Sequence, residues 1–123
     1  MAATQTLTLV VEDDSSTREF VVRALEKKGM ATIQATTVGE ALVALQQEPL
    51  PSTLILDLML PDANGVILLR RIRRDDMPIR VAVVTGMTDP EGFFNTMKLT
   101  PDRIFKKPLR LTELINWLQE DDD

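Results

Sequence analysis

Charged and hydroxyl side chains end four apolar runs of this 123-residue chain. The runs and the residues that follow them are 6–11 with Glu12 and Asp13, 53–56 with Asp57, 80–84 with Thr85, and 102–106 with Lys107. The chain has no histidine and no cysteine. This excludes disulfides, thiolate or imidazole zinc sites, and Ser-His-Asp or Cys-His nucleophiles. The remaining chemistry must use carboxylates, lysine, hydroxyls and backbone groups.

Strand and helix patterns alternate along the chain and predict how these residues are positioned. Strands are expected at 6–11, 30–35, 53–56, 80–84 and 102–106. Apolar stripes at helical spacing fall at 20–25, 38–45, 68–72, 90–97 and 111–118. Residues 15–17 offer caps for the first helix, Gly29 ends it, and Pro49 closes the second. Five βα units in a row predict one α/β domain over 1–123, a doubly wound open parallel sheet, because a closed barrel needs eight strands.

The carboxyl ends of parallel strands share one edge of a sheet, where ligands of open α/β folds bind. Glu12, Asp13 and Asp57 are therefore expected to converge there. Carboxylates crowded together need a cation, and oxygen ligands without nitrogen or sulfur suit Mg²⁺. A carboxylate beside Mg²⁺, with Lys107 and Thr85 to hold phosphoryl oxygens, is a plausible phosphoryl acceptor. The expected product is an aspartyl phosphate.

These segments resemble the receiver domain of two-component response regulators, of which the single-domain chemotaxis regulator is the best-known member. The matching segments are 10–14 (VVEDD), 54–65 (LILDLMLPDANG), 83–86 (VVTG) and 105–109 (FKKPL). An acidic pair alone is a weak signal. All four segments in this order, with an Asp-x-x-x-Pro-x-x-x-Gly loop, form a strong one.

The resemblance implies a flavodoxin-like strand order of 2-1-3-4-5 and a role for each site residue. Asp57 would accept a phosphoryl group from the phosphohistidine of a histidine kinase or phosphotransfer protein. Glu12, Asp13 and Asp57 would hold Mg²⁺ together with the backbone carbonyl of Met59. Lys107 would bind the phosphoryl group, its peptide bond to Pro108 would be cis, and Thr85 would be the switch hydroxyl. The chain would be a bacterial phosphoprotein, a switch that catalyses only its own phosphotransfer and dephosphorylation, not an enzyme acting on other substrates.

Three positions depart from the usual receiver pattern. Ile104 stands where receivers usually carry a tyrosine or phenylalanine, and residues 99–102 (LTPD) replace the usual Gly-Ala turn. Both departures affect how a change at Thr85 would be transmitted to the face formed by the fourth helix, fifth strand and fifth helix. Glu12 replaces the commoner aspartate.

Met59 and Met87 stand two residues beyond Asp57 and Thr85. Since a thioether orients water poorly, we expect slow autodephosphorylation.

Partners are expected to be proteins. Phe94 and Trp117 fall beside the main stripes of their helices. If exposed, they would mark a docking site for a downstream target on the fourth helix, fifth strand and fifth helix. The chain is expected to be a monomer or a weak dimer. The sequence does not identify the kinase, the target or the signal.

A net charge of −5 argues against nucleic-acid binding. The arginines at 70, 71, 73 and 74 are more typical of one solvated helix face, and residues 120–123 are expected to form a frayed acidic tail. No apolar run approaches the roughly 20 residues that span a bilayer. With no signal-peptide pattern at the start, a cytoplasmic location is expected.

Other functions fit these residues less well than the receiver does. A haloacid-dehalogenase-type hydrolase needs a second aspartate where Met59 stands. A flavin-binding module needs uncharged phosphate loops, whereas 12–14 is acidic, and no Gly-x-Gly-x-x-Gly or P-loop pattern occurs. Two alternatives stay open: a receiver-like interaction module that works without phosphorylation, and a receiver excised from a larger regulator or hybrid kinase.

Overall fold

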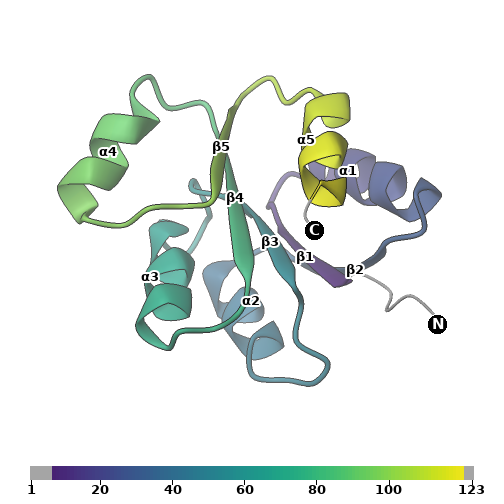
Figure 1. The fold of residues 1–123 in the computed structure, drawn as a ribbon, viewed down its shortest axis with the longest axis horizontal. Helices are drawn as coiled ribbons and strands as arrows, with labels where there is room; N and C mark the ends of the chain where they lie inside the picture. Colours follow the sequence, from purple (N-terminus) through teal and green to yellow (C-terminus); the bar gives the residue numbers. More distant parts are fainter. Residues whose placement is uncertain (1–6, 121–123) are drawn as a thin grey trace.

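A computed structural model describes residues 7–120 as a five-stranded parallel sheet with helices on both faces (Figure 1). The strands are β1 (Leu7–Val11), β2 (Ala31–Ala35), β3 (Thr53–Asp57), β4 (Arg80–Thr85) and β5 (Arg103–Lys106). The helices are α1 (Ser15–Lys27), α2 (Val38–Ala44), α3 (Val66–Arg74), α4 (Pro90–Met97) and α5 (Leu111–Gln119). The strand order is β2-β1-β3-β4-β5, which confirms the predicted fold.

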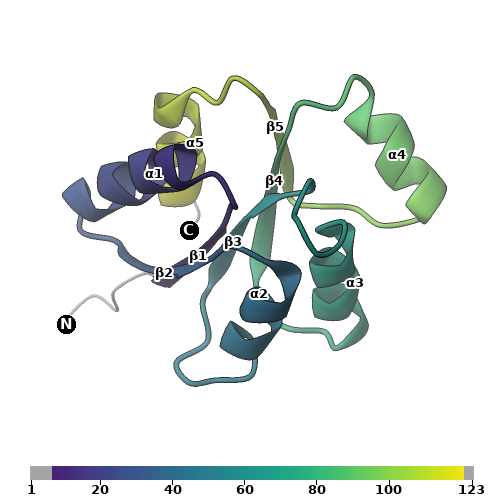
Figure 2. The same cartoon turned by 180° about the vertical axis from the view of Figure 1, so that it is seen from behind.

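Alternate residues of the central strands feed two apolar cores, one on each face of the sheet. Leu9, Leu54 and Val81 face the larger core beneath α2, α3 and α4. Their neighbours Val10 and Ile55 face the smaller core beneath α1 and α5. Figures 1 and 2 show these two groups of helices on opposite sides of the sheet. Because both faces of the sheet are covered by helices, successive residues of the central strands are buried, and these strands appear in the sequence as near-continuous apolar runs.

Capping residues set several boundaries differently from the sequence-based expectation. Asp14, not the Ser/Thr residues at 15–17, caps α1, because its carboxylate accepts a hydrogen bond from the Thr17 amide at 2.8 Å. Gly29 ends that helix as predicted, with φ of 80°. Helix α2 ends at Ala44, before Pro49 is reached. Of the expected acidic tail, Glu120 follows α5, and 121–123 lie outside the described residues.

Phe20 was expected on the buried face of α1, and this expectation is wrong. Its side chain is 60% exposed, whereas Val21, Val22 and Leu25 are buried. Successive helical residues are about 100° apart, so a face centred between Val21 and Val22 directs Phe20 away from the sheet. The helix therefore presents a large aromatic side chain to solvent.

Neither Phe94 nor Trp117 is exposed, so the condition for a docking site at these side chains is not met. Phe94 is 3% exposed and meets Phe93 edge to face, and Trp117 is 7% exposed. Trp117 lies between the Phe105 ring and the Arg80 guanidinium, whose carbon is 4.1 Å from the indole centroid. These contacts remove the aromatic basis for a docking site on the face of α4, β5 and α5.

Three of the four arginines of α3 form ion pairs within the domain. Arg71 and Arg74 both contact Asp75, at 2.7 and 3.1 Å. Arg73 contacts Asp102 at 3.0 Å and also donates to the Thr100 carbonyl. These arginines therefore form contacts within the domain, on a solvated helix face and with the neighbouring loop. This agrees with the expectation of a solvated helix face. No helix within residues 7–120 is long and apolar enough to cross a membrane.

One polar atom of the described core lacks a hydrogen-bond partner. Thr8 lies on β1 with its side chain fully buried, and its hydroxyl oxygen contacts no donor or acceptor. A buried hydroxyl without a partner costs free energy of folding. This position is therefore a local weakness of the sheet.

Candidate functional site: an acidic edge with one lysine

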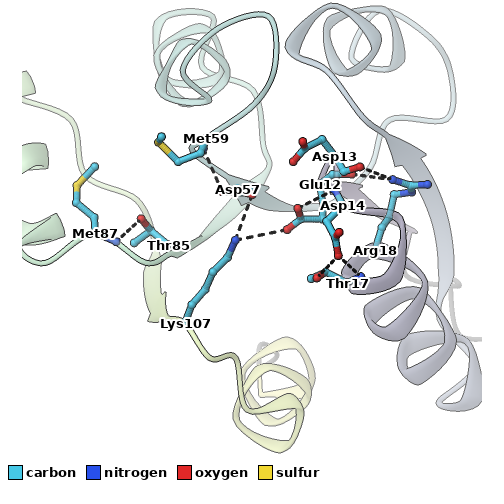
Figure 3. A network of polar contacts seen from close by, with 10 residues as sticks. All are labelled: Glu12, Asp13, Asp14, Thr17, Arg18, Asp57, Met59, Thr85, Met87 and Lys107. Atoms are coloured by element: carbon cyan, nitrogen blue, oxygen red, sulfur yellow. Dashed lines mark hydrogen bonds and ion pairs between the residues drawn. The ribbon is translucent and has the colours of Figure 1, made fainter.

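Three carboxylates converge at the carboxyl edge of the sheet. Glu12 and Asp13 follow β1, and Asp57 is the last residue of the neighbouring strand β3. One oxygen from each lies within 4.8 Å of the others (Figure 3). Glu12 and Asp57 are buried and Asp13 is exposed, so the cluster opens to solvent on one side. The three oxygens can hold one divalent ion, which would keep water on the open side.

Burial makes the charge of Glu12 costly. Its side chain is 7% exposed, and desolvation, with a smaller contribution from the Asp57 carboxylate, raises the pKa of Glu12 above its ordinary value. The Asp14 amide donates to Glu12 Oε2 at 3.1 Å and opposes this rise. Because burial disfavours the charged carboxylate, a bound cation would stabilise the ionised form of Glu12.

Both oxygens of Asp57 have a donor. Oδ1 accepts a hydrogen bond from the Met59 amide at 3.0 Å, and Oδ2 lies 3.3 Å from Lys107 Nζ. Lys107 Nζ is also 3.8 Å from Glu12 Oε1. The lysine ammonium thus lies within ion-pair distance of two of the acids. Its bond to Pro108 is cis, as predicted. Its neighbour Lys106 instead donates to the Thr88 carbonyl at 3.1 Å, away from the acids.

Thr85 ends β4 beside β3 and is 1% exposed. Its hydroxyl oxygen accepts a hydrogen bond from the Met87 amide at 3.1 Å. A hydroxyl that accepts from a backbone amide still has its own proton to donate. The Thr85 carbonyl also accepts from the Lys107 amide at 2.8 Å, which ties the lysine to the same strand end.

Gly65 holds the loop that follows Asp57. Its amide donates to the Leu58 carbonyl at 2.8 Å. A Cβ at this position would lie 2.5 Å from the Asp57 carbonyl oxygen and 2.9 Å from a Leu56 methyl group. Only glycine fits without displacing the strand end that carries Asp57. The spacing of the Asp-x-x-x-Pro-x-x-x-Gly loop follows from this close approach.

Arg18 is a residue of the site that sequence reasoning missed. Arg18 Nη1 donates to the carbonyls of Glu12 and Asp13, at 2.9 and 3.4 Å, and so fixes the backbone that carries them. Its only sequence signal is its place one turn into α1. Asp14 caps that helix, and Asp62 accepts hydrogen bonds from two amides at the start of α2, at 2.9 and 3.0 Å. Both acids therefore serve as caps.

Comparison with known proteins decides the family. The family model described as "Response regulator receiver domain" matches residues 8–119. The chain belongs to this receiver family. Receiver domains are signalling switches rather than classical enzymes, and they interact with histidine kinases and downstream effectors. One similar protein is the response regulator receiver protein CpdR of Brucella abortus, 31% identical over 119 residues that cover 91% of this chain and 92% of CpdR.

Solved receiver structures share the fold. A response regulator receiver protein from Pseudomonas putida superposes with a TM-score of 0.86 at 28% identity, over 98% of this chain and 100% of that one. A response regulator from Burkholderia pseudomallei, solved with a phosphorylated aspartic acid, has a TM-score of 0.81 at 25% identity, over 95% and 68%. This chain spans about half the length of several other relatives, which are transcriptional regulatory proteins.

Proposed function

We propose that this receiver takes a phosphoryl group onto Asp57 from the phosphohistidine of a kinase or phosphotransfer protein, with Mg²⁺ held by Glu12, Asp13, Asp57 and the Met59 carbonyl. The observation that carries the proposal is the surrounding of the Asp57 carboxylate. It is 4% exposed, has Lys107 Nζ at 3.3 Å, and belongs to an acid cluster that can hold a metal ion. The phosphorylated aspartic acid of the Burkholderia relative supports the same chemistry here.

In the proposed step, an Asp57 oxygen attacks phosphorus as the bond from phosphorus to the donor imidazole nitrogen breaks. The imidazole takes up a proton, and the product is an acyl phosphate. Lys107 and the Thr85 hydroxyl offer donors for phosphoryl oxygens, and a bound Mg²⁺ would supply further charge neutralisation. Since the chain has no histidine, the donor imidazole must belong to the partner.

The test is incubation of the chain with acetyl phosphate and Mg²⁺, followed by intact mass measurement. The expected result is one phosphoryl adduct that requires Mg²⁺ and disappears in Asp57→Asn. No adduct, or one that survives this substitution, would overturn the proposal. A chain that takes up no phosphoryl group yet binds a partner would instead be an interaction module that works without phosphorylation.

We further propose that the donor protein docks on the groove between α1 and the loop after β5. Phe20, Lys107, Pro108 and Leu109 are among the residues that line this groove. An exposed aromatic side chain in the same groove as Lys107, whose ammonium contacts the acceptor Asp57, is a suitable anchor for the protein that delivers the phosphoryl group. Phe20→Ala should slow transfer from a phosphorylated histidine phosphotransfer protein at least tenfold and leave labelling by acetyl phosphate unchanged. Val43→Ala, which alters an exposed residue of α2, is the matched control.

Hydrolysis of the acyl phosphate is proposed to be slow. Water attack on phosphorus is faster when a nearby group accepts a hydrogen bond from the attacking water. The thioether of Met59, whose amide contacts Asp57, is a weak acceptor. The adduct should therefore persist after the phosphodonor is removed, and loss of the adduct within seconds in Mg²⁺ alone would contradict this proposal.

A further inference from the structure

Met59 combines high exposure with a position beside the acceptor carboxylate. Its side chain is 70% exposed, the highest value among the large apolar side chains that are exposed in residues 7–120. Its amide donates to Asp57 Oδ1 at 3.0 Å, so the side chain leaves the backbone directly next to the acceptor. In Figure 3 it lies on the opposite side of Asp57 from Glu12 and Asp13.

Methionine is also the only readily oxidised sulfur in the chain, which has six methionines and no cysteine. Oxidation of methionine depends on access of the oxidant to the sulfur. Met30 is 9% exposed, and Met77, Met87 and Met97 are intermediate. Met59 is therefore the most accessible methionine of the described residues. The less exposed methionines provide internal references for the rate of its oxidation.

We propose that Met59 is a site of reversible oxidation by hydroperoxides, and that oxidation shortens the lifetime of the phosphorylated state. The proposal rests on the proposed phosphorylation of Asp57. In the step, a lone pair of the Met59 sulfur attacks the terminal peroxide oxygen, and an S–O bond forms as the O–O bond breaks. Water leaves when the oxidant is hydrogen peroxide, and an alcohol leaves when it is an organic hydroperoxide. The sulfur loses two electrons and the peroxide gains them, which gives methionine sulfoxide.

The product changes the chemistry beside the acceptor. A thioether sulfur is a weak hydrogen-bond acceptor, whereas a sulfoxide oxygen is a strong, polar one. Because the exposed side chain begins beside Asp57 and can rotate at the surface, this oxygen can reach a water molecule that approaches the phosphorus and accept a hydrogen bond from it. Oxidation thus supplies the water-orienting group that the unmodified side chain lacks, and it should accelerate hydrolysis. Because methionine sulfoxide reductases reverse the reaction, the effect is reversible.

The test treats the full chain with hydrogen peroxide, locates the sulfoxides by peptide mapping, and measures the lifetime of the adduct formed with acetyl phosphate and Mg²⁺. We expect Met59 to oxidise well before Met30 and the lifetime to shorten at least threefold. Treatment with a methionine sulfoxide reductase should restore it. Met59→Leu should make the lifetime insensitive to peroxide, whereas Met87→Leu and Met97→Leu should remain sensitive.

A second variant gives an independent result without peroxide. Met59→Gln places an amide oxygen at similar reach and should shorten the lifetime in untreated protein. An unchanged lifetime after Met59 is oxidised, or equal shortening in Met59→Leu, would overturn the inference. Failure of the untreated chain to take up a phosphoryl group would instead refute the proposed function, and the inference with it, before peroxide is added.

Discussion

Replacement of Lys107 by methionine removes the ammonium group and keeps most of the apolar stem. Lys107 Nζ lies 3.3 Å from Asp57 and 3.8 Å from Glu12. During phosphoryl transfer this ammonium would donate to a phosphoryl oxygen, and a hydrogen bond to a charged group contributes about 1.5–3 kcal/mol. Because the lysine side chain is 39% exposed, we take the lower part of this range, about 1.5–2 kcal/mol. At about 1.4 kcal/mol per factor of ten, Lys107→Met should slow phosphorylation roughly 10- to 30-fold.

The assay is a time course of intact mass with acetyl phosphate and saturating Mg²⁺. Lys106→Met is the matched control, because Lys106 is the adjacent lysine and contacts the Thr88 carbonyl instead of the acids. Its rate should stay within twofold of wild type, and circular dichroism should show that both variants are folded. Equal slowing of the two variants, or a Lys107→Met rate close to wild type, would refute the assignment of Lys107.

Three further expectations follow from single positions. Gly65→Ala should lower the free energy of unfolding by about 1–3 kcal/mol and slow phosphorylation, because a Cβ there meets the backbone of Asp57. Gly39→Ala, with only ordinary contacts, should cause no loss, and equal effects in urea unfolding would contradict this reasoning. Thr8→Val should raise the free energy of unfolding by about 1 kcal/mol, since it removes a buried hydroxyl without a partner; a lower melting temperature would count against it. Amide hydrogen bonds lower the pKa of Asp62, so its contribution to stability is present above about pH 4 and is lost as the pH falls through the lowered pKa. The stability of Asp62→Asn, measured by urea unfolding, should therefore fall less than that of wild type below pH 4, and parallel curves would exclude this contribution.

The sequence predicted the fold well because buried parallel strands leave a simple pattern. Each central strand is apolar on both faces and stops at a polar residue, so the strand ends could be located from composition alone. Helix boundaries were less predictable. Asp14 and the serines and threonine that follow it can all cap a helix, and only the backbone conformation selects Asp14.

The positions of the candidate site residues were predictable because these residues lie at or just beyond strand ends, which the topology brings to one edge. In the sequence, the following proline distinguishes Lys107 from Lys106, and the structure gives the two lysines different contacts. The exposure of Phe20 and the burial of Phe94 were not predictable from spacing. Each depends on the rotation of a helix against the sheet, and that rotation is set by neighbouring elements.

The central claim is that Asp57 is the phosphorylated residue, and its most direct test is chemical. An acyl phosphate on an aspartate is reduced by borohydride to homoserine, which tandem mass spectrometry locates at one position. After treatment with acetyl phosphate and Mg²⁺, we expect homoserine at position 57 and at no other aspartate. Homoserine at position 13, or at none, would contradict the account.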